Sequence, residues 1–339
     1  MKTPISREAL ELYRRCDVID LHVDTFIWTR IFGYDLLERH GRGLFGARFY
    51  GHADLPRLRE AGVGGAIWSI TTNPLRTAKG RARVFRRNLD RLVEIFERSS
   101  DVTICRTASD HRAARAQGKH AAFIGVQGGN ALDDAPTLET IDASLLVKVT
   151  LVHLSTSTLG STSAPSLRKD AGLTARGREL VRALGARRIF VDLAHISRRG
   201  FFDAVEVHDR TQPLLVSHTG IAGVHRHWRN VDDEQLRAIA ATGGVIGVMY
   251  QSSFLGQPFF GGRAEAIVEH LQHIIDVVGE DHAALGSDWD GAIITPRDLQ
   301  TCLELPWLCE LMLRRGWTPE RVGKALGGNF LRALEALRG

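Results

Sequence analysis

The stretch Val18-Ile19-Asp20-Leu21-His22-Val23-Asp24 decides how the rest of the chain is interpreted. It is a short apolar run, which predicts a buried strand, and the two-residue period of a strand points His22 and Asp24 to the same face at its end. Two such side chains can hold a metal ion together, although many core histidines only form a hydrogen bond with a nearby carboxylate. The pair alone leaves both interpretations open.

Similar apolar runs recur along the whole sequence, each followed by a segment with helical periodicity. Their apolar residues are continuous, which is typical of parallel strands covered on both faces. The predicted strands are residues 18–24, 63–70, 121–126, 145–152, 188–194, 213–217, 245–250 and 282–287. Eight strands that alternate with helices predict an α/β fold of the (β/α)8, or TIM barrel, type.

The length of the chain and the order of its segments set the domain expectation. We expect one (β/α)8 domain over residues 1–339, with a C-terminal helical extension from about 303 to 339. Residues 28–50 have no clear period and predict a long loop after the first strand. A doubly wound open sheet is the alternative fold, but no G-x-G-x-x-G or P-loop follows the first strand.

Polar side chains follow nearly every predicted strand, at the point where the strand ends. They are His22, Asp24, Gln127, His153, His195, His218 and Asp288. In a barrel these strand ends converge on one face, where active sites lie. Each histidine alone could be an ordinary core residue, but the whole set predicts a metal centre. Histidine and carboxylate ligands suit zinc or a similar divalent ion, and their number is sufficient for two ions.

Such a centre polarises a carbonyl and lowers the pKa of a bound water, so we expect hydrolysis of an amide or ester. Asp288 lies where a carboxylate can contact the metal and pass a proton to a leaving amine. Arg229, in the loop after the His218 strand, can bind a substrate carboxylate through a bidentate fork, or it can be a surface arginine. No Gly-x-Ser-x-Gly motif appears, which disfavours a serine triad.

Composition narrows the class of protein. The 339 residues carry a formal net charge of +5, but 39 acidic residues are interleaved with the basic ones, so we expect solvated helix faces and no nucleic-acid partner. The first residues form no apolar signal core and no stretch is long enough for a membrane span, so we expect a cytoplasmic protein that does not bind a membrane. Four scattered cysteines form no CxxC pair and predict buried thiols.

Six runs of the sequence carry a family resemblance. They are VIDLHVD at 18–24, GLTARGRELV at 172–181, VDLAHIS at 191–197, HLQHI at 270–274, GSDWDG at 286–291 and GGNFLR at 327–332. Together they resemble the membrane (renal) dipeptidase family of zinc metallopeptidases, peptidase family M19, in the amidohydrolase superfamily. The resemblance implies a two-zinc barrel, often a homodimer, that cleaves dipeptides and in some members accepts a D-residue at the C-terminal position.

The resemblance also implies roles for the residues at the matching positions. His22 and Asp24 match the ligands of one zinc, and His195 and His218 match the ligands of the other. Asp288 matches the carboxylate that contacts the metal centre and transfers a proton. The remaining two matches concern the substrate: His153 matches the histidine that polarises the scissile carbonyl, and Arg229 the arginine near the C-terminal carboxylate.

One position departs from the family. A glutamate in a Glu-Gly-Gly run bridges the two zincs there, whereas this chain has Gln127-Gly128-Gly129. A neutral amide cannot bridge two dications as a carboxylate does, so the sequence leaves open whether two zincs bind or one. Two functions follow: a zinc hydrolase of dipeptides or related amides, or a relative with altered or lost peptidase activity. Such a relative would be a binding or accessory protein, or act on a non-peptide amide or a lactone.

Overall fold

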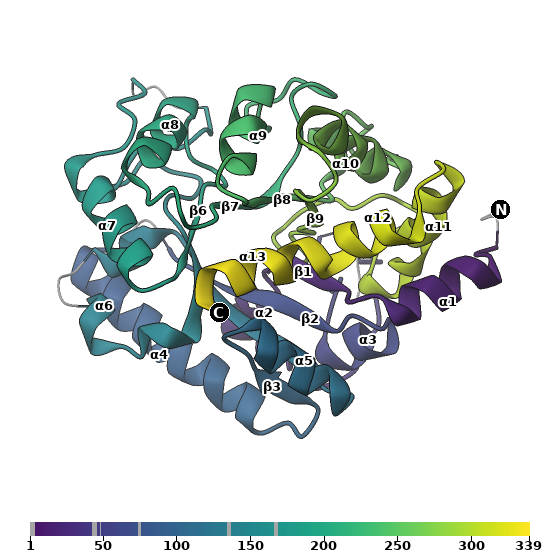
Figure 1. The fold of residues 1–339 in the computed structure, drawn as a ribbon. Coiled ribbons are helices and arrows are strands. Elements are labelled where there is room, and N and C mark those ends of the chain that lie inside the picture. The colour runs from purple at the N-terminus through teal and green to yellow at the C-terminus, as the bar shows by residue number, and fades with distance from the viewer. Residues whose placement is uncertain (1–3, 43–45, 48, 74–75, 134–136, 166–168) are drawn as a thin grey trace.

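A parallel β-barrel forms the centre of the protein (Figure 1), which is described by a computed structural model over residues 4–42, 46–47, 49–73, 76–133, 137–165 and 169–339. Its strands, in spatial order, are β1 (Ile19–Val23), β2 (Gly65–Thr71), β4 (His120–Gln127), β5 (Leu146–Thr150), β6 (Phe190–Asp192), β7 (Leu215–Thr219), β8 (Val245–Val248) and β9 (Ala283–Leu285). Every pair along this order is parallel.

The barrel closes where the chain beyond β9 returns to β1. Val23 and Trp289 form a parallel bridge. The backbone N–H of Asp24 donates to Trp289 O at 2.8 Å, and the N–H of Asp288 donates to His22 O at 3.0 Å. These bonds confirm the predicted (β/α)8 barrel and bring both ends of the sheet, with His22, Asp24 and Asp288, to one place.

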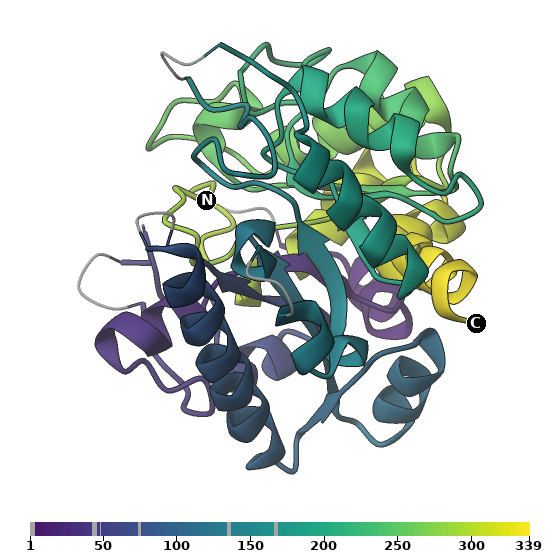
Figure 2. The ribbon, with the colours of Figure 1, turned by 90° about the vertical axis from the view of Figure 1, so that its left-hand side faces the viewer.

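Helices surround the barrel on its outer side (Figures 1 and 2). They are α1 (Arg7–Arg15), α2 (Phe26–Phe32), α3 (Leu55–Glu60), α4 (Ala78–Glu97), α5 (Ala108–Ala116), α6 (Thr137–Thr140), α7 (Ala175–Ala186), α8 (Arg198–Val207), α9 (Asp233–Ala240), α10 (Glu265–Val278), α11 (Pro306–Arg314), α12 (Pro319–Gly323) and α13 (Asn329–Arg338). Side chains of Ser, Thr or Asp cap many of them: Thr77, for example, accepts from Gly80 N and Asp232 from Gln235 N.

Three elements differ from the sequence prediction. The start of the expected loop at 28–50 belongs to α2, whose N-cap Thr25 makes no side-chain cap bond. The short strand β3 (Val102–Ile104) pairs with β4 outside the barrel order. The helical extension expected from about 303 to 339 is interrupted by a π-turn, Lys324–Gly328, where a Cβ on Gly327 would approach Asp17 O to 2.4 Å.

The helix α13 covers the barrel at the end where the strands begin, and Figure 1 shows it, in yellow, lying across the barrel. Its Phe330 packs edge-on against Phe123 of β4, with ring centroids 5.4 Å apart, and against Phe190 of β6 at 6.1 Å. Leu334 and Leu337 join the same buried cluster as Ile19 and the other inward-facing strand residues. Within the described part of the chain, no helix is both long and apolar enough to cross a membrane.

Candidate metal centre

Three buried ligand atoms converge at the carboxyl ends of the strands. His22, His218 and Asp288 come from β1, from β7 and from the segment after β9, and their ligand atoms lie within 4.8 Å of one another. The His22 Nε2 atom lies 3.6 Å from Asp24 Oδ1 and 3.7 Å from Asp288 Oδ1, and it has no hydrogen-bond partner among the described residues. A buried imidazole nitrogen that faces two carboxylates fits a divalent cation.

Two residues of the centre have a backbone conformation that non-glycine residues rarely adopt. The φ angles of His195 and Asp288 are +66° and +65°. Such strain is concentrated at functional sites, where the surrounding structure holds it in place. Gly291 leaves space for the Asp288 carboxylate, because a Cβ at position 291 would lie 2.2 Å from Asp288 Oδ1. The backbone conformation at these two strand ends therefore fixes the direction in which the side chains of His195 and Asp288 point.

Gln127, at the end of β4, occupies the space between two histidines. Its amide Nε2 lies 3.2 Å from His195 Nε2 and 3.4 Å from His218 Nε2, and these two imidazole nitrogens are 2.9 Å apart. The nearer of the two contacts is with His195, and an amide N–H that donates there uses the imidazole lone pair that a metal ion would need. On its other side, Thr71 Oγ1 lies within hydrogen-bond distance of Gln127 Oε1 and Asp24 Oδ1. The residues that the family would use for a second ion fit it poorly in this arrangement.

A fully buried lysine lies below the centre, and sequence reasoning missed it. Lys148 Nζ, on β5, lies 2.8 Å from Asp192 Oδ2, 2.9 Å from His22 Nδ1 and 3.0 Å from Ser217 Oγ. The signal was available, because Lys148 is the only charged residue of β5, whose other residues are apolar except for Thr150. Its ammonium adds positive charge next to a candidate metal ligand, whereas Asp192 balances it from the other side.

Burial governs the protonation of the centre. It lowers the pKa values of His22, His195 and His218, which keeps these imidazoles neutral and able to coordinate. Burial and the neighbouring Asp24 raise the pKa of Asp288 well above its usual value, although Arg229 acts in the opposite direction. Burial also raises the pKa of Asp24, but the interactions with His22 and Thr71 outweigh burial, so the pKa of Asp24 is lowered overall.

The two residues expected to contact substrate lie beside the ligands. The His153 ring packs edge-on against the His195 ring, with centroids 4.7 Å apart, and burial lowers its pKa to about 4. Arg229 is buried rather than on the surface, its Nη2 donates to His218 O at 2.7 Å, and its Nε has no hydrogen-bond partner among the described residues. Such an arginine has donor capacity left for a ligand.

Comparisons with known proteins show the family of the chain. A family model described as membrane dipeptidase (peptidase family M19) matches residues 6–338. The chain belongs to the membrane dipeptidase family. It is a metallopeptidase of this family, a hydrolase that acts on peptide bonds, and the family implies dependence on a metal.

Three relatives illustrate the membership. Dipeptidase tcpJ of Claviceps purpurea (strain 20.1) is 29% identical over 294 residues, which cover 84% of this chain and 69% of the relative. Dipeptidase verJ of Clonostachys rogersoniana is 28% identical over 300 residues, with coverage of 84% and 76%. The crystal structure of a metallopeptidase from Rhodobacter sphaeroides, liganded with a phosphinate mimic of the dipeptide L-Ala-D-Ala, superimposes with a TM-score of 0.83 at 26% identity, covering 94% of this chain and 99% of that one.

Within this dipeptidase-family fold, the seven side chains expected at strand ends do meet at one end of the barrel. His22, His218 and Asp288 form the closest group of ligand atoms. Asp24 lies next to this group because it contacts His22. Gln127 and His195 lie next to it because they contact His218. The loop histidines 225 and 227 stack on each other, with ring centroids 6.3 Å apart, and do not belong to that group.

Proposed function

We propose that this protein is a dipeptidase that uses one divalent ion, held by His22, His218 and Asp288. The observation that carries the proposal is the convergence of these three buried ligand atoms within 4.8 Å, around a His22 Nε2 that has no hydrogen-bond partner among the described residues. Zinc is the ion that best suits two imidazoles and a carboxylate. When bound, the ion would supply Lewis-acid polarisation of the scissile carbonyl and a water of lowered pKa.

The remaining steps belong to the side chains of the protein. Asp288 receives a proton from the attacking water and returns it to the leaving amine, a role for which its position among His22 and Asp24 is suited. His153 donates a hydrogen bond to the carbonyl oxygen of the substrate. Arg229 binds the C-terminal carboxylate through its Nε edge, which has no other partner among the described residues.

We propose one ion instead of two because of Gln127 and Lys148. Gln127 carries no charge, and its nearer imidazole contact directs an N–H toward the lone pair of His195, 3.2 Å away. Lys148 adds a positive charge 2.9 Å from His22 Nδ1. Both residues disfavour a second dication, since the mutual repulsion of two ions needs bridging negative charge.

Several finer features of the proposal rest on the sequence and on relatives. A D-residue at the C-terminal position is supported by the L-Ala-D-Ala mimic bound to the Rhodobacter sphaeroides relative. A homodimer and a cytoplasmic location remain predictions from the sequence. So does the organisation of residues 1–339 as one domain, for which the packing of α13 against the barrel interior is the support.

Metal content and activity test the proposal together. We expect the purified protein to hold about one zinc per chain by elemental analysis and to cleave members of a dipeptide library that includes D-residues. The variant Gln127→Glu should hold more metal per chain, because it restores an anion between the two candidate sites. The conservative control Gln127→Asn keeps the amide and should not gain metal.

The opposite results are equally informative. A wild type that binds no zinc and cleaves nothing, while Gln127→Glu gains both, would show that the natural protein has lost peptidase chemistry and acts as a binding or accessory protein. Two zinc ions per wild-type chain would contradict the single-ion proposal. In that case the amide of Gln127 would have to present its oxygen to the metal.

A further inference from the structure

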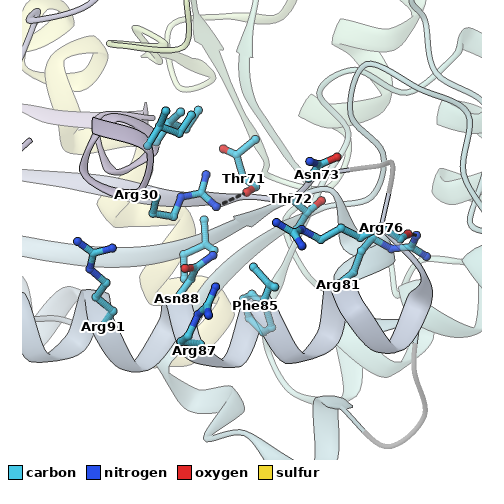
Figure 3. Close-up of a pocket in the computed structure, with 14 residues that line it drawn as sticks. Arg30, Thr71, Thr72, Asn73, Arg76, Arg81, Phe85, Arg87, Asn88 and Arg91 are labelled. Carbon is cyan, nitrogen blue, oxygen red and sulfur yellow. Dashed lines mark hydrogen bonds between the residues drawn. The ribbon is translucent and has the colours of Figure 1, made fainter. Parts of the chain in front are cut away.

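A basic cavity of about 560 Å³ lies between α2, the end of β2 and α4 (Figure 3). Its lining includes five arginines: Arg30, Arg76, Arg81, Arg87 and Arg91. Figure 3 shows that they come from both sides, with Arg30 on α2 and Arg81, Arg87 and Arg91 on α4. Among the described residues, no aspartate or glutamate lines the cavity. So much positive charge in one hollow fits an anionic ligand.

The arginines are only partly neutralised by the protein. Arg81 lies 3.7 Å from Asp133, which is outside the lining. Arg30 donates through Nη1 to Thr71 O at 2.8 Å, whereas its Nε is buried without a hydrogen-bond partner among the described residues. Arg76 and Arg87 have no side-chain ion pair with the described part of the chain. Burial lowers the pKa of Arg30 and Asp24 acts in the opposite direction, while the neighbouring Arg91 and Arg76 lower it further through their mutual repulsion.

The cavity adjoins the candidate metal centre through one residue. Thr71 lines the cavity, and its Oγ1 lies 2.7 Å from Asp24 Oδ1 and 3.0 Å from Gln127 Oε1. Ile70 and Phe85 add apolar surface to the lining, and Asn88 adds an amide. An anionic group on a short apolar stem matches this combination of surfaces.

We propose that this cavity binds the acidic side chain of the substrate, so that the enzyme prefers dipeptides containing glutamate or aspartate. The inference rests on the proposed dipeptidase function and names its substrate class. The guanidinium groups pair with the carboxylate through charge-assisted hydrogen bonds. Because the cavity lies outside the ligand set, its arginines set specificity and do not take part in bond cleavage.

Matched substrates and variants test the proposal. Dipeptides that differ only by Glu or Gln, at either position, are compared in kcat/KM. We expect the double substitution of Arg76→Gln and Arg87→Gln to lower the value for the Glu substrate about tenfold and to leave the Gln substrate nearly unchanged. The control Arg83→Gln, on the same helix but outside the lining, should leave both values unchanged. A Glu preference that persists in the double variant, or is absent in the wild type, overturns the proposal.

A binding measurement separates failure of this inference from failure of the proposed function. Glutarate, a dicarboxylate with a short apolar stem, is titrated into the protein by calorimetry. If no dipeptide is cleaved but glutarate binds, and the double variant weakens that binding at least about fivefold while Arg83→Gln does not, the anion pocket stands and the dipeptidase function falls. If dipeptides are cleaved but glutarate binding is equal in all three proteins, the pocket proposal falls.

Discussion

Burying the charged side chain of Lys148 is energetically unfavourable by itself. Its side chain and that of Asp192 are fully buried, with 2.8 Å between Nζ and Oδ2. Two charges lose their hydration in such a place, and only a close pair with further hydrogen bonds compensates for it. Thr150 and Ser217 supply those bonds, each donating to Asp192 while lying next to Lys148 Nζ. The pair thus forms a fixed polar floor below His22.

Removing one partner of this pair should be far worse than removing both. We expect Lys148→Met to lower the free energy of unfolding by about 3–5 kcal/mol, because it leaves a buried carboxylate without its countercharge. The double variant Lys148→Met, Asp192→Asn should recover most of that loss. Urea denaturation of the wild type, both single variants and the double variant measures the coupling, and strictly additive effects would contradict it.

The same double variant tests the link between Lys148 and the metal centre. It should bind zinc more tightly than the wild type, because the lost ammonium, 2.9 Å from His22 Nδ1, acts on His22 more strongly than the lost Asp192 carboxylate does. Competition with a chelator of known affinity measures this. Equal zinc affinities in the two proteins would mean that Lys148 acts only on stability.

At the scale of elements, α13 closes the barrel at the end away from the metal centre. It contributes Phe330, Leu334 and Leu337 to the buried cluster of inward-facing strand residues. In a barrel of this size the interior is filled by side chains, so a helix across one end completes the core without narrowing the opposite mouth. The helix that completes the core therefore lies at one end of the barrel, and the candidate metal centre lies at the other.

Truncating Phe330 should therefore destabilise the fold without altering the site. We expect Phe330→Ala to lower the free energy of unfolding by about 3–5 kcal/mol through loss of packing and creation of a cavity. A matched control is Phe32→Ala on α2, where the ring is 73% exposed and the change should stay within about 0.5 kcal/mol. Denaturant unfolding compares the two. The KM of folded Phe330→Ala should equal that of the wild type, and an altered KM would show coupling between the two ends of the barrel.

At the scale of the whole molecule, buried histidines make the protein sensitive to acid. Burial is the main cause of a lowered pKa for ten of the fourteen histidines: His22, His52, His111, His120, His153, His195, His208, His218, His227 and His270. His120 is a case far from the metal centre. It accepts from Trp68 Nε1 at Nε2 and donates from Nδ1 to Val63 O, and burial lowers its pKa to about 4.

The sign of the resulting pH dependence follows from linkage. Between pH 6.5 and 4 the unfolded chain protonates His120 and the folded chain does not, so stability is complete above 6.5 and falls as the pH falls toward 4. The contribution of this one residue is about 3 kcal/mol. The variant His120→Gln, whose amide can replace both hydrogen bonds, should show a shallower fall over that range and an unchanged slope above pH 7. Unfolding free energies measured from pH 4 to 8 test this, and parallel curves would contradict it.

The sequence alone determined the class of fold and the set of candidate ligands. Continuous apolar runs such as 121–126 are typical of strands buried on both faces, and their alternation with helices indicates a parallel barrel. Because the carboxyl ends of all its strands meet at one mouth, residues as distant as His22 and Asp288 could be assigned to one centre before any contact was known. The departure at Gln127 was also visible in the sequence.

Only the tertiary structure decided what surrounds those ligands. Local periodicity describes the face that a residue occupies, not what approaches it from another strand, so the contact of Lys148 with His22 and Asp192 could not be predicted. The same holds for the cavity, whose arginines come from α2, from α4 and, for Arg76, from the segment before α4; the sequence alone indicates only an expected loop and solvated helix faces there. Charged side chains form a binding site only when the fold brings them close together, because electrostatic attraction depends on separation in space.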